Sequence, residues 1–270
     1  MQTIGDMIKY IMFKKLLAVV FVIVLFVIVN NIFRFSTNIA QTTPAPSTAN
    51  TNLPLGIGFN VNNKTYNFLY FYADPDLLKL VPNFSEKLTS IEIMGQNRCI
   101  NGINAGFYTT DRKPVGLFET VDEKLANAKN SSLFDVNLVK FGDQLLFNRL
   151  NQPIEGVSAD GFAIQIGPRL FQNFNPVSLT IRNDEYARRM VVAKTSDEKV
   201  LFLAIYDPST SYQGPLLADL PHALGSIEKL LNITISDAAN LDGGSASAFY
   251  SDTASLNEVS LVGSFFCVTQ

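Results

Sequence analysis

The chain has 270 residues, which is enough for one sizeable domain with a well-buried core. An apolar share of 47% with 21 Phe excludes a disordered or low-complexity protein. The net charge of −3 and the 17% of charged residues provide no basic stripe for phosphate backbones, so we expect no nucleic-acid partner.

The N-terminal segment has the character of a membrane anchor. Residues 16–29 form an unbroken apolar run, and Ile32 and Phe33 extend it to about the length of a membrane span. Lysines precede the run and Arg34 alone follows closely, which predicts a cytoplasmic N-terminus and places the rest of the chain outside. A cleaved signal peptide also fits the apolar length and would give a secreted protein. The sequence around Ala40 is a poor cleavage pattern, so we favour an uncleaved single-pass anchor.

A change of composition after the apolar run divides the chain into three parts. Residues 36–55 are rich in Pro, Thr, Ser and Asn and carry no charge, as a solvated linker does. We therefore predict a cytoplasmic N-terminus with a transmembrane anchor over 1–35, a linker over 36–55 and one folded domain over 56–270.

Most of the folded domain has the pattern of strands. Residues 65–73 alternate aromatic with other side chains, and "RCINGINAGFY" predicts a buried strand that opens into a glycine-containing loop. Gly142-Asp143 joins two apolar runs in a predicted hairpin, and a polar turn over 196–198 joins two more. Further strands are expected over 162–166, directly after the turn Gly167-Pro168, in "DAANLDGG" and in "SFFCVT".

Two segments have helical periodicity. "SEKLTSIEIMGQ" predicts a helix with Ser85 as its N-cap, and "PLLADLPHALGSIEKLLN" predicts a longer one with Pro215 near its first turn. Many strands in mixed order with few helices indicate an α+β domain built on an antiparallel or mixed β-sheet core.

The sequence offers few of the residues that metals and activated nucleophiles need. Its single histidine, His222, lies within the predicted longer helix, and we interpret it as a structural or surface residue. The two cysteines, Cys99 and Cys267, are too far apart for a metal-ligand motif, and a disulfide and two buried thiols fit their strand-like contexts equally. We therefore expect neither a metal nor a cofactor.

Three motifs occur in order along the domain: "INAGFYTTDRKPVGL" (103–117), "AIQIGPRLFQN" (163–173) and "AANLDGGSASAF" (238–249). Together they resemble the phosphodiester glycosidase family, over about residues 60–270. The resemblance implies a hydrolase that cleaves the glycosidic bond of a sugar-1-phosphodiester in a glycan or cell-envelope polymer, with a glycan or sugar phosphate as its substrate.

Residue chemistry suggests how such a site would work. Asp242 is the candidate acid, base or electrostatic stabiliser, and Asn104 is expected to position the substrate. Arg189 is suited to the phosphate, because its planar guanidinium can bind two oxygens at once. Gly243, Gly244 and Ser245 are expected to aim backbone N–H groups at the same anion. The resemblance adds three substrate-binding candidates: Gly106, Asp219 and Ser247.

The chain departs from the family pattern beside Arg189. Met190 and Ala193 stand where the family has a hydroxyl and a glycine, and Asp219 stands where it has a longer acid. These departures keep open an alternative function on the same fold, a non-catalytic module that binds glycans or scaffolds the cell envelope.

Overall fold

A computed structural model describes residues 56–152, 154 and 157–270 of the chain. The predicted linker and transmembrane anchor lie outside these residues. Within the described part, no helix has the length and apolar character to cross a membrane.

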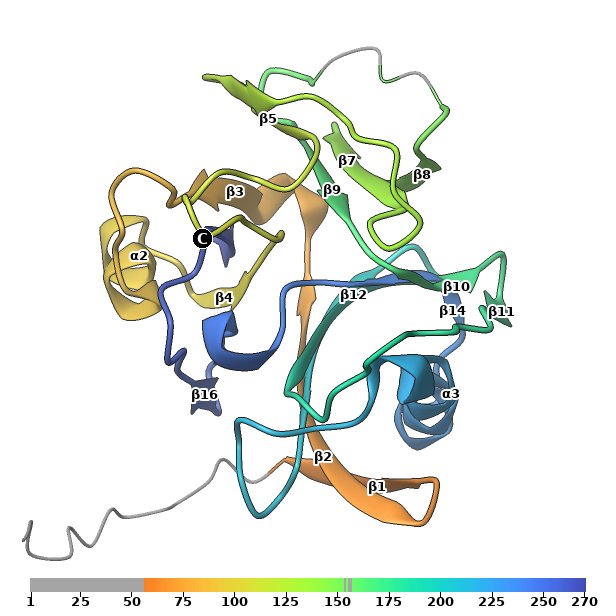
Figure 1. Cartoon of the computed structure of the whole chain (residues 1–270). Coiled ribbons are helices and arrows are strands. Elements are labelled where there is room, and N and C mark those ends of the chain that lie inside the picture. The colour runs from red at the N-terminus through yellow and green to blue at the C-terminus, as the bar shows by residue number, and fades with distance from the viewer. Residues whose placement is uncertain (1–55, 153, 155–156) are drawn as a thin grey trace, which may run out of the picture. The chain divides into compact units, whose positions relative to one another are not determined.

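The longest sheet, with seven strands in the described part, runs in the order β1-β2-β13-β12-β14-β10-β11 (Figure 1). Its strands in chain order are β1 Ile57–Val61, β2 Lys64–Ala73, β10 Arg169–Gln172, β11 Asn175–Pro176, β12 Arg189–Thr195, β13 Val200–Tyr206 and β14 Ile235–Asn240.

Two smaller sheets complete the β-structure of the described residues. One has the order β16-β15-β4-β17-β3, and the other has the order β6-β5-β9-β7-β8. Strands of the first are β3 Leu78–Pro82, β4 Asn101–Asn104, β15 Phe249–Tyr250, β16 Ser255–Leu256 and β17 Ser264–Val268. Strands of the second are β5 Phe118–Thr120, β6 Lys124–Ala126, β7 Val136–Phe141, β8 Gln144–Arg149 and β9 Phe162–Ile166.

Every strand pair in the described part is antiparallel, so the expected α+β class with an antiparallel core is confirmed. The predicted hairpins are β7–β8 and β12–β13, and the predicted strand over 65–73 is β2.

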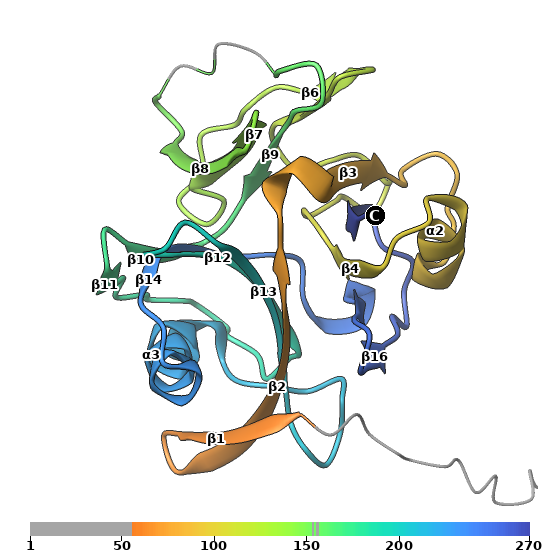
Figure 2. The ribbon, with the colours of Figure 1, turned by 180° about the vertical axis from the view of Figure 1, so that it is seen from behind.

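The two faces of the seven-stranded sheet are covered differently, because alternate residues of each strand point to opposite sides. On β12, Val191 and Ala193 pack under helix α3 (Leu220–Leu231). Met190 and Val192 point the other way, into an interior shared with the two smaller sheets. Figures 1 and 2 show α3 beside β10 and β14, and helix α2 (Ser90–Gln96) beside β4.

Both helices begin later than the sequence predicts. The cap of α2 is Thr89 and not Ser85, because Thr89 and Glu92 form a reciprocal capping box with the backbone. Helix α3 begins at Leu220 with Pro221 in its first turn, so Pro215 lies outside it. The segment between them includes a short 3-10 turn, η2 Leu217–Asp219; others are η1 Pro75–Leu77 and η3 Gly244–Ala246.

Cys99 and Cys267 form a disulfide, with a Cα–Cα distance of 5.3 Å. It connects the segment after α2 to β17, and the cysteines are 168 residues apart in sequence. The choice that the sequence left open is therefore settled in favour of the bridge.

We expect loss of this disulfide to destabilise the domain by about 2–5 kcal/mol, because it closes a long loop in the unfolded chain. The test is the free energy of unfolding in urea for Cys99→Ser, Cys267→Ser and the double variant. The free energy of unfolding should fall by a similar amount in all three variants. A reducing agent should lower that of the wild type to the same level and leave the variants unchanged. A wild-type protein insensitive to reduction would contradict the prediction.

Candidate active site

The motif around Asp242 crosses from one sheet to another. Asn240 ends β14 and pairs with Val191 of β12, while the Leu241 N–H donates to the Met190 carbonyl at 2.8 Å. The next N–H, of Asp242, donates to the Ala105 carbonyl at 3.0 Å, directly after β4. The chain thus leaves the seven-stranded sheet and joins the β4 sheet within two residues.

The side chain of Asn104 is hydrogen-bonded to the backbone of the Asp242 loop. It is 1% exposed, and its Nδ2 donates to the Asp242 carbonyl at 2.6 Å, while its Oδ1 accepts from the Ala248 N–H at 2.9 Å. The structure therefore places Asn104 next to Asp242, with its amide bonded to backbone on both sides of the loop.

Glycine is required at positions 243 and 244, at the first because backbone lies very close and at the second because of its backbone conformation. A Cβ on Gly243 would lie 2.7 Å from the Arg188 carbonyl oxygen, and Gly244 has φ of 64°. The Gly244 N–H donates to that same Arg188 carbonyl at 2.8 Å. The expectation that this N–H faces a substrate anion is therefore wrong, because the chain itself occupies it.

A cleft of about 590 Å³ opens in front of the Asp242 loop. One part of its wall is apolar, and in it the Phe107 and Phe134 rings lie with centroids 4.7 Å apart. The other part consists of polar side chains and backbone groups. The full lining is Phe107, Leu133, Phe134, Gly167, Ile181, Arg182, Asn183, Asp184, Glu185, Ala187, Arg189, Leu217, Asn240, Asp242, Gly243, Gly244 and Ser245.

Asp242 is half-buried at this cleft, and its carboxyl group has an unusual affinity for protons. Burial raises its pKa from the ordinary 3.8 to about 7, against a smaller lowering by the Gly243 N–H. No arginine contributes to the shift. A carboxyl group with this pKa is able to hold and release a proton near neutrality.

Arg189 is also at the cleft, but Asp184 binds it tightly. Its Nη2 lies 3.2 Å from Asp184 Oδ1, and the two side chains are each 11% exposed. Further N–H groups of Arg189 donate to the carbonyls of Pro215, at 3.0 Å, and of Glu185. Burial lowers the pKa of Arg189, and Asp184 opposes that lowering.

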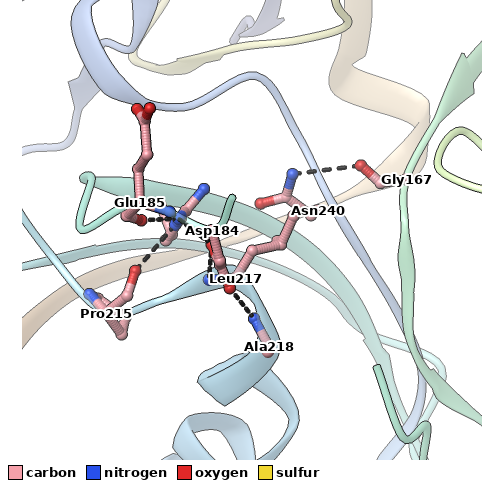
Figure 3. Close-up of polar contacts among 8 residues, drawn as sticks. Gly167, Asp184, Glu185, Pro215, Leu217, Ala218 and Asn240 are labelled. Atoms are coloured by element: carbon pink, nitrogen blue, oxygen red, sulfur yellow. Dashed lines mark hydrogen bonds and ion pairs between the residues drawn. The ribbon is translucent and has the colours of Figure 1, made fainter. Parts of the chain in front are cut away.

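Asp184 is a residue that the sequence analysis missed. Its carboxylate accepts from the N–H groups of Leu217 and Ala218, at 3.0 and 2.9 Å (Figure 3). It thereby connects the loop before β12 to the segment before α3. The available signal was the acidic pair Asp184-Glu185 shortly before Arg189.

The remaining predicted residues lie beside the cleft or away from it. Ser245 lines the cleft and is exposed. Ser247 is fully buried and accepts from Arg188 Nε at 2.7 Å, and Gly106 is buried against Ile164. Asp219 accepts from Asn62 Nδ2 at 2.8 Å and does not line the cleft, so the structure does not bring it together with Asp242.

The departures beside Arg189 lie in the interior of the domain. Met190 and Ala193 are 0% exposed and pack on opposite faces of β12, in the two main apolar clusters. Neither lines the cleft. His222 is exposed on α3 and lines a different surface hollow.

Among residues 56–152, 154 and 157–270, no three His, Cys, Asp or Glu residues gather in a way that would hold a metal ion. The polar groups that line the cleft are carboxylates, guanidinium groups, the side-chain amides of Asn183 and Asn240, the Ser245 hydroxyl and backbone groups.

Comparisons with known proteins agree with the motifs. The family model for phosphodiester glycosidase (NAGPA) matches residues 97–266. No curated protein matches the chain.

Three solved structures have a similar fold at 12–14% identity, a level that shows the fold alone. The catalytic domain of zebrafish N-acetylglucosamine-1-phosphodiester alpha-N-acetylglucosaminidase, auto-inhibited by its pro-peptide, has a TM-score of 0.54 at 12% identity, over 80% of this chain and 87% of that one. A hypothetical protein from Synechocystis has a TM-score of 0.53 at 14% identity; the match covers 78% of this chain but only 61% of that protein. A putative exported protein from Burkholderia pseudomallei has a TM-score of 0.51 at 12% identity, over 76% and 74% of the two chains.

We expect Gly243→Ala to destabilise the domain by about 1–3 kcal/mol, because the added Cβ meets a backbone oxygen that cannot move aside. Gly225→Ala is the matched control. Gly225 lies within α3, and a Cβ added there would meet no atom within 4 Å, so that change should stabilise by about 0.5–1 kcal/mol. Urea unfolding of both variants checks the pair, and equal stabilities would refute it.

The Asp242 carboxyl is expected to titrate near pH 7 in the folded protein. Between its ordinary value of 3.8 and about 7, the folded chain holds a proton that the unfolded chain has lost. The free energy of unfolding should therefore fall as pH rises through this window, and Asp242→Asn should remove that part of the slope. Unfolding curves across the window measure it; identical slopes in both proteins would count against a raised pKa.

Proposed function

Because this chain belongs to the phosphodiester glycosidase family, we propose that it is an extracytoplasmic hydrolase that cleaves the glycosidic bond of a sugar-1-phosphodiester. The substrate that we propose is a glycan or a cell-envelope polymer. The observation that carries the proposal is Asp242, a carboxyl group with a pKa of about 7 at the wall of an open cleft that also contains arginine.

Hydrolysis requires a proton for the leaving oxygen and a water molecule at the anomeric carbon. In the proposed reaction, protonated Asp242 gives its proton to the phosphate oxygen as the bond from that oxygen to the anomeric carbon breaks. Water adds to the carbon and loses a proton, so the products are a free sugar and a phosphomonoester. Glu185 is the proposed base for that water, since it is exposed at the cleft and Asp184 is occupied by Arg189 and two backbone N–H groups.

Two arginines support recognition of the diester. Arg189 is fixed in direction by Asp184 and by carbonyl groups, which suits it to hold an anion in one place. Arg182 is exposed at the cleft, and within the described chain no acid forms an ion pair with it. It therefore adds a positive charge that Asp184 does not neutralise.

The proposed location outside the cytoplasm is supported by the disulfide. Bridges such as Cys99–Cys267 persist mainly in oxidising compartments. The anchor predicted over residues 16–33 would hold the domain at the outer surface of a membrane.

We expect Asp242→Asn to lower kcat by about 100- to 10,000-fold, because the amide cannot donate the proton at the leaving oxygen. The measurement is sugar release from the methyl diester of N-acetylglucosamine 1-phosphate and from UDP-N-acetylglucosamine. Asp143→Asn, in the exposed turn between β7 and β8, is the control and should retain wild-type rates.

Equal activity of Asp242→Asn and the wild type would remove Asp242 from the mechanism. Tight glycan binding by a wild type that releases no sugar would instead support the non-catalytic alternative.

A further inference from the structure

The side chain of Asn240 is held rigidly at the cleft. It is 3% exposed, and its Nδ2 donates to the Gly167 carbonyl at 3.2 Å. Its backbone exchanges two more bonds with the same turn, from the Gly167 N–H and to the Pro168 carbonyl, each 3.0 Å. The amide orientation follows from these contacts, because the reverse orientation would set two carbonyl oxygens against each other.

Asn240 Oδ1 accepts no hydrogen bond from any residue of the described chain. Figure 3 shows Nδ2 turned to Gly167 and the oxygen turned away from it. Buried acceptors without a partner are rare in folded proteins, because each carries a desolvation cost. Asn137 Oδ1 and Arg188 Nη1 are also unpaired, but of these three residues Asn240 alone lines the cleft.

Asn240 and Asp242 face the cleft together. Leu241 between them is buried in the core, and both of its neighbours line the cleft. Residues two apart in an extended chain are separated by about 7 Å. A single sugar ring can bridge that separation, with the bond to be broken at Asp242 and another ring substituent at Asn240.

The kind of group that Oδ1 binds follows from its chemistry. An amide oxygen accepts hydrogen bonds and donates none, and an ionised phosphodiester also only accepts. Oδ1 therefore does not recognise the phosphate. A sugar presents donors, in its ring hydroxyls and in any acylamino N–H.

We propose that Asn240 is a specificity-determining residue whose Oδ1 accepts a hydrogen bond from one hydroxyl or acylamino N–H of the sugar that is bound beside Asp242. This inference rests on the proposed function, since it assigns the sugar end of the same cleft. A site built around one buried acceptor discriminates strongly against an analogue that lacks the matching donor.

The experiment compares the wild type and Asn240→Ala on the methyl diester of N-acetylglucosamine 1-phosphate and on derivatives that each lack one donor of the sugar. The wild type should lose about 10- to 100-fold in kcat/KM on one derivative. Asn240→Ala should lose a similar factor on the parent compound and lose nothing further on that derivative. Asn137→Ala, which removes a buried unpaired amide oxygen outside the cleft, should show the wild-type pattern.

A merely structural role predicts a different pattern. If Asn240→Ala lowers kcat/KM by one common factor on every compound, the inference is overturned. If the wild type releases no sugar, its affinity for the same compounds is measured by calorimetry. Weaker binding of a single derivative by the wild type, with no such difference in Asn240→Ala, would then support the inference while the proposed function fails. Absence of binding to all of the compounds would overturn both.

Discussion

The site depends on the way the backbone of Asp242 is bound to β4. The Asp242 N–H donates to the carbonyl of Ala105, directly after β4, and the Asp242 carbonyl accepts from the side chain of Asn104, the last residue of β4. A carboxyl group that loses water on burial would otherwise regain it by a small outward movement of its loop. The two bonds oppose that movement, so the cost of desolvation appears as a raised pKa and not as a displaced loop.

The pairing of Arg189 with Asp184 is compatible with the raised pKa of Asp242. An unpaired arginine beside Asp242 would favour the charged carboxylate and lower its pKa. Asp184 pairs with Arg189 and offsets its charge, and its own bonds to the Leu217 and Ala218 N–H groups fix the direction of the guanidinium. Arg182 has no such partner in the described chain, but it is exposed, so water and salt screen its charge. The cleft thereby holds a proton donor and a cation at the same time.

Sequence reasoning found the elements whose patterns are local. The predicted hairpins β7–β8 and β12–β13 are confirmed. In each of them, two apolar runs joined by a short polar turn specify the pairing within a few residues. The start of α2 was wrong because two cap signals, Ser85 and Thr89, compete there, and only Thr89 has Glu92 three residues later. Of the residues predicted for the site, Asp242 and Arg189 line the cleft. Asp184 and the unpaired amide oxygen of Asn240 were not predicted, because they depend on contacts across the fold that no local pattern contains.

The departures at Met190 and Ala193 bear on packing more than on chemistry. Both side chains lie in the interior, one on each face of β12. An apolar methionine in place of a hydroxyl suits the apolar surroundings of position 190, because a buried hydroxyl would need a hydrogen-bond partner there. What β12 contributes to the cleft is Arg189 at its first position, and the carbonyl of Arg188, directly before the strand, binds the Gly244 N–H behind it. The backbone contribution is independent of the side chains that follow on the strand. The solved structures at 12–14% identity share the fold alone, and the chemistry at the cleft of this chain depends on the few side chains that strand ends and loops present there.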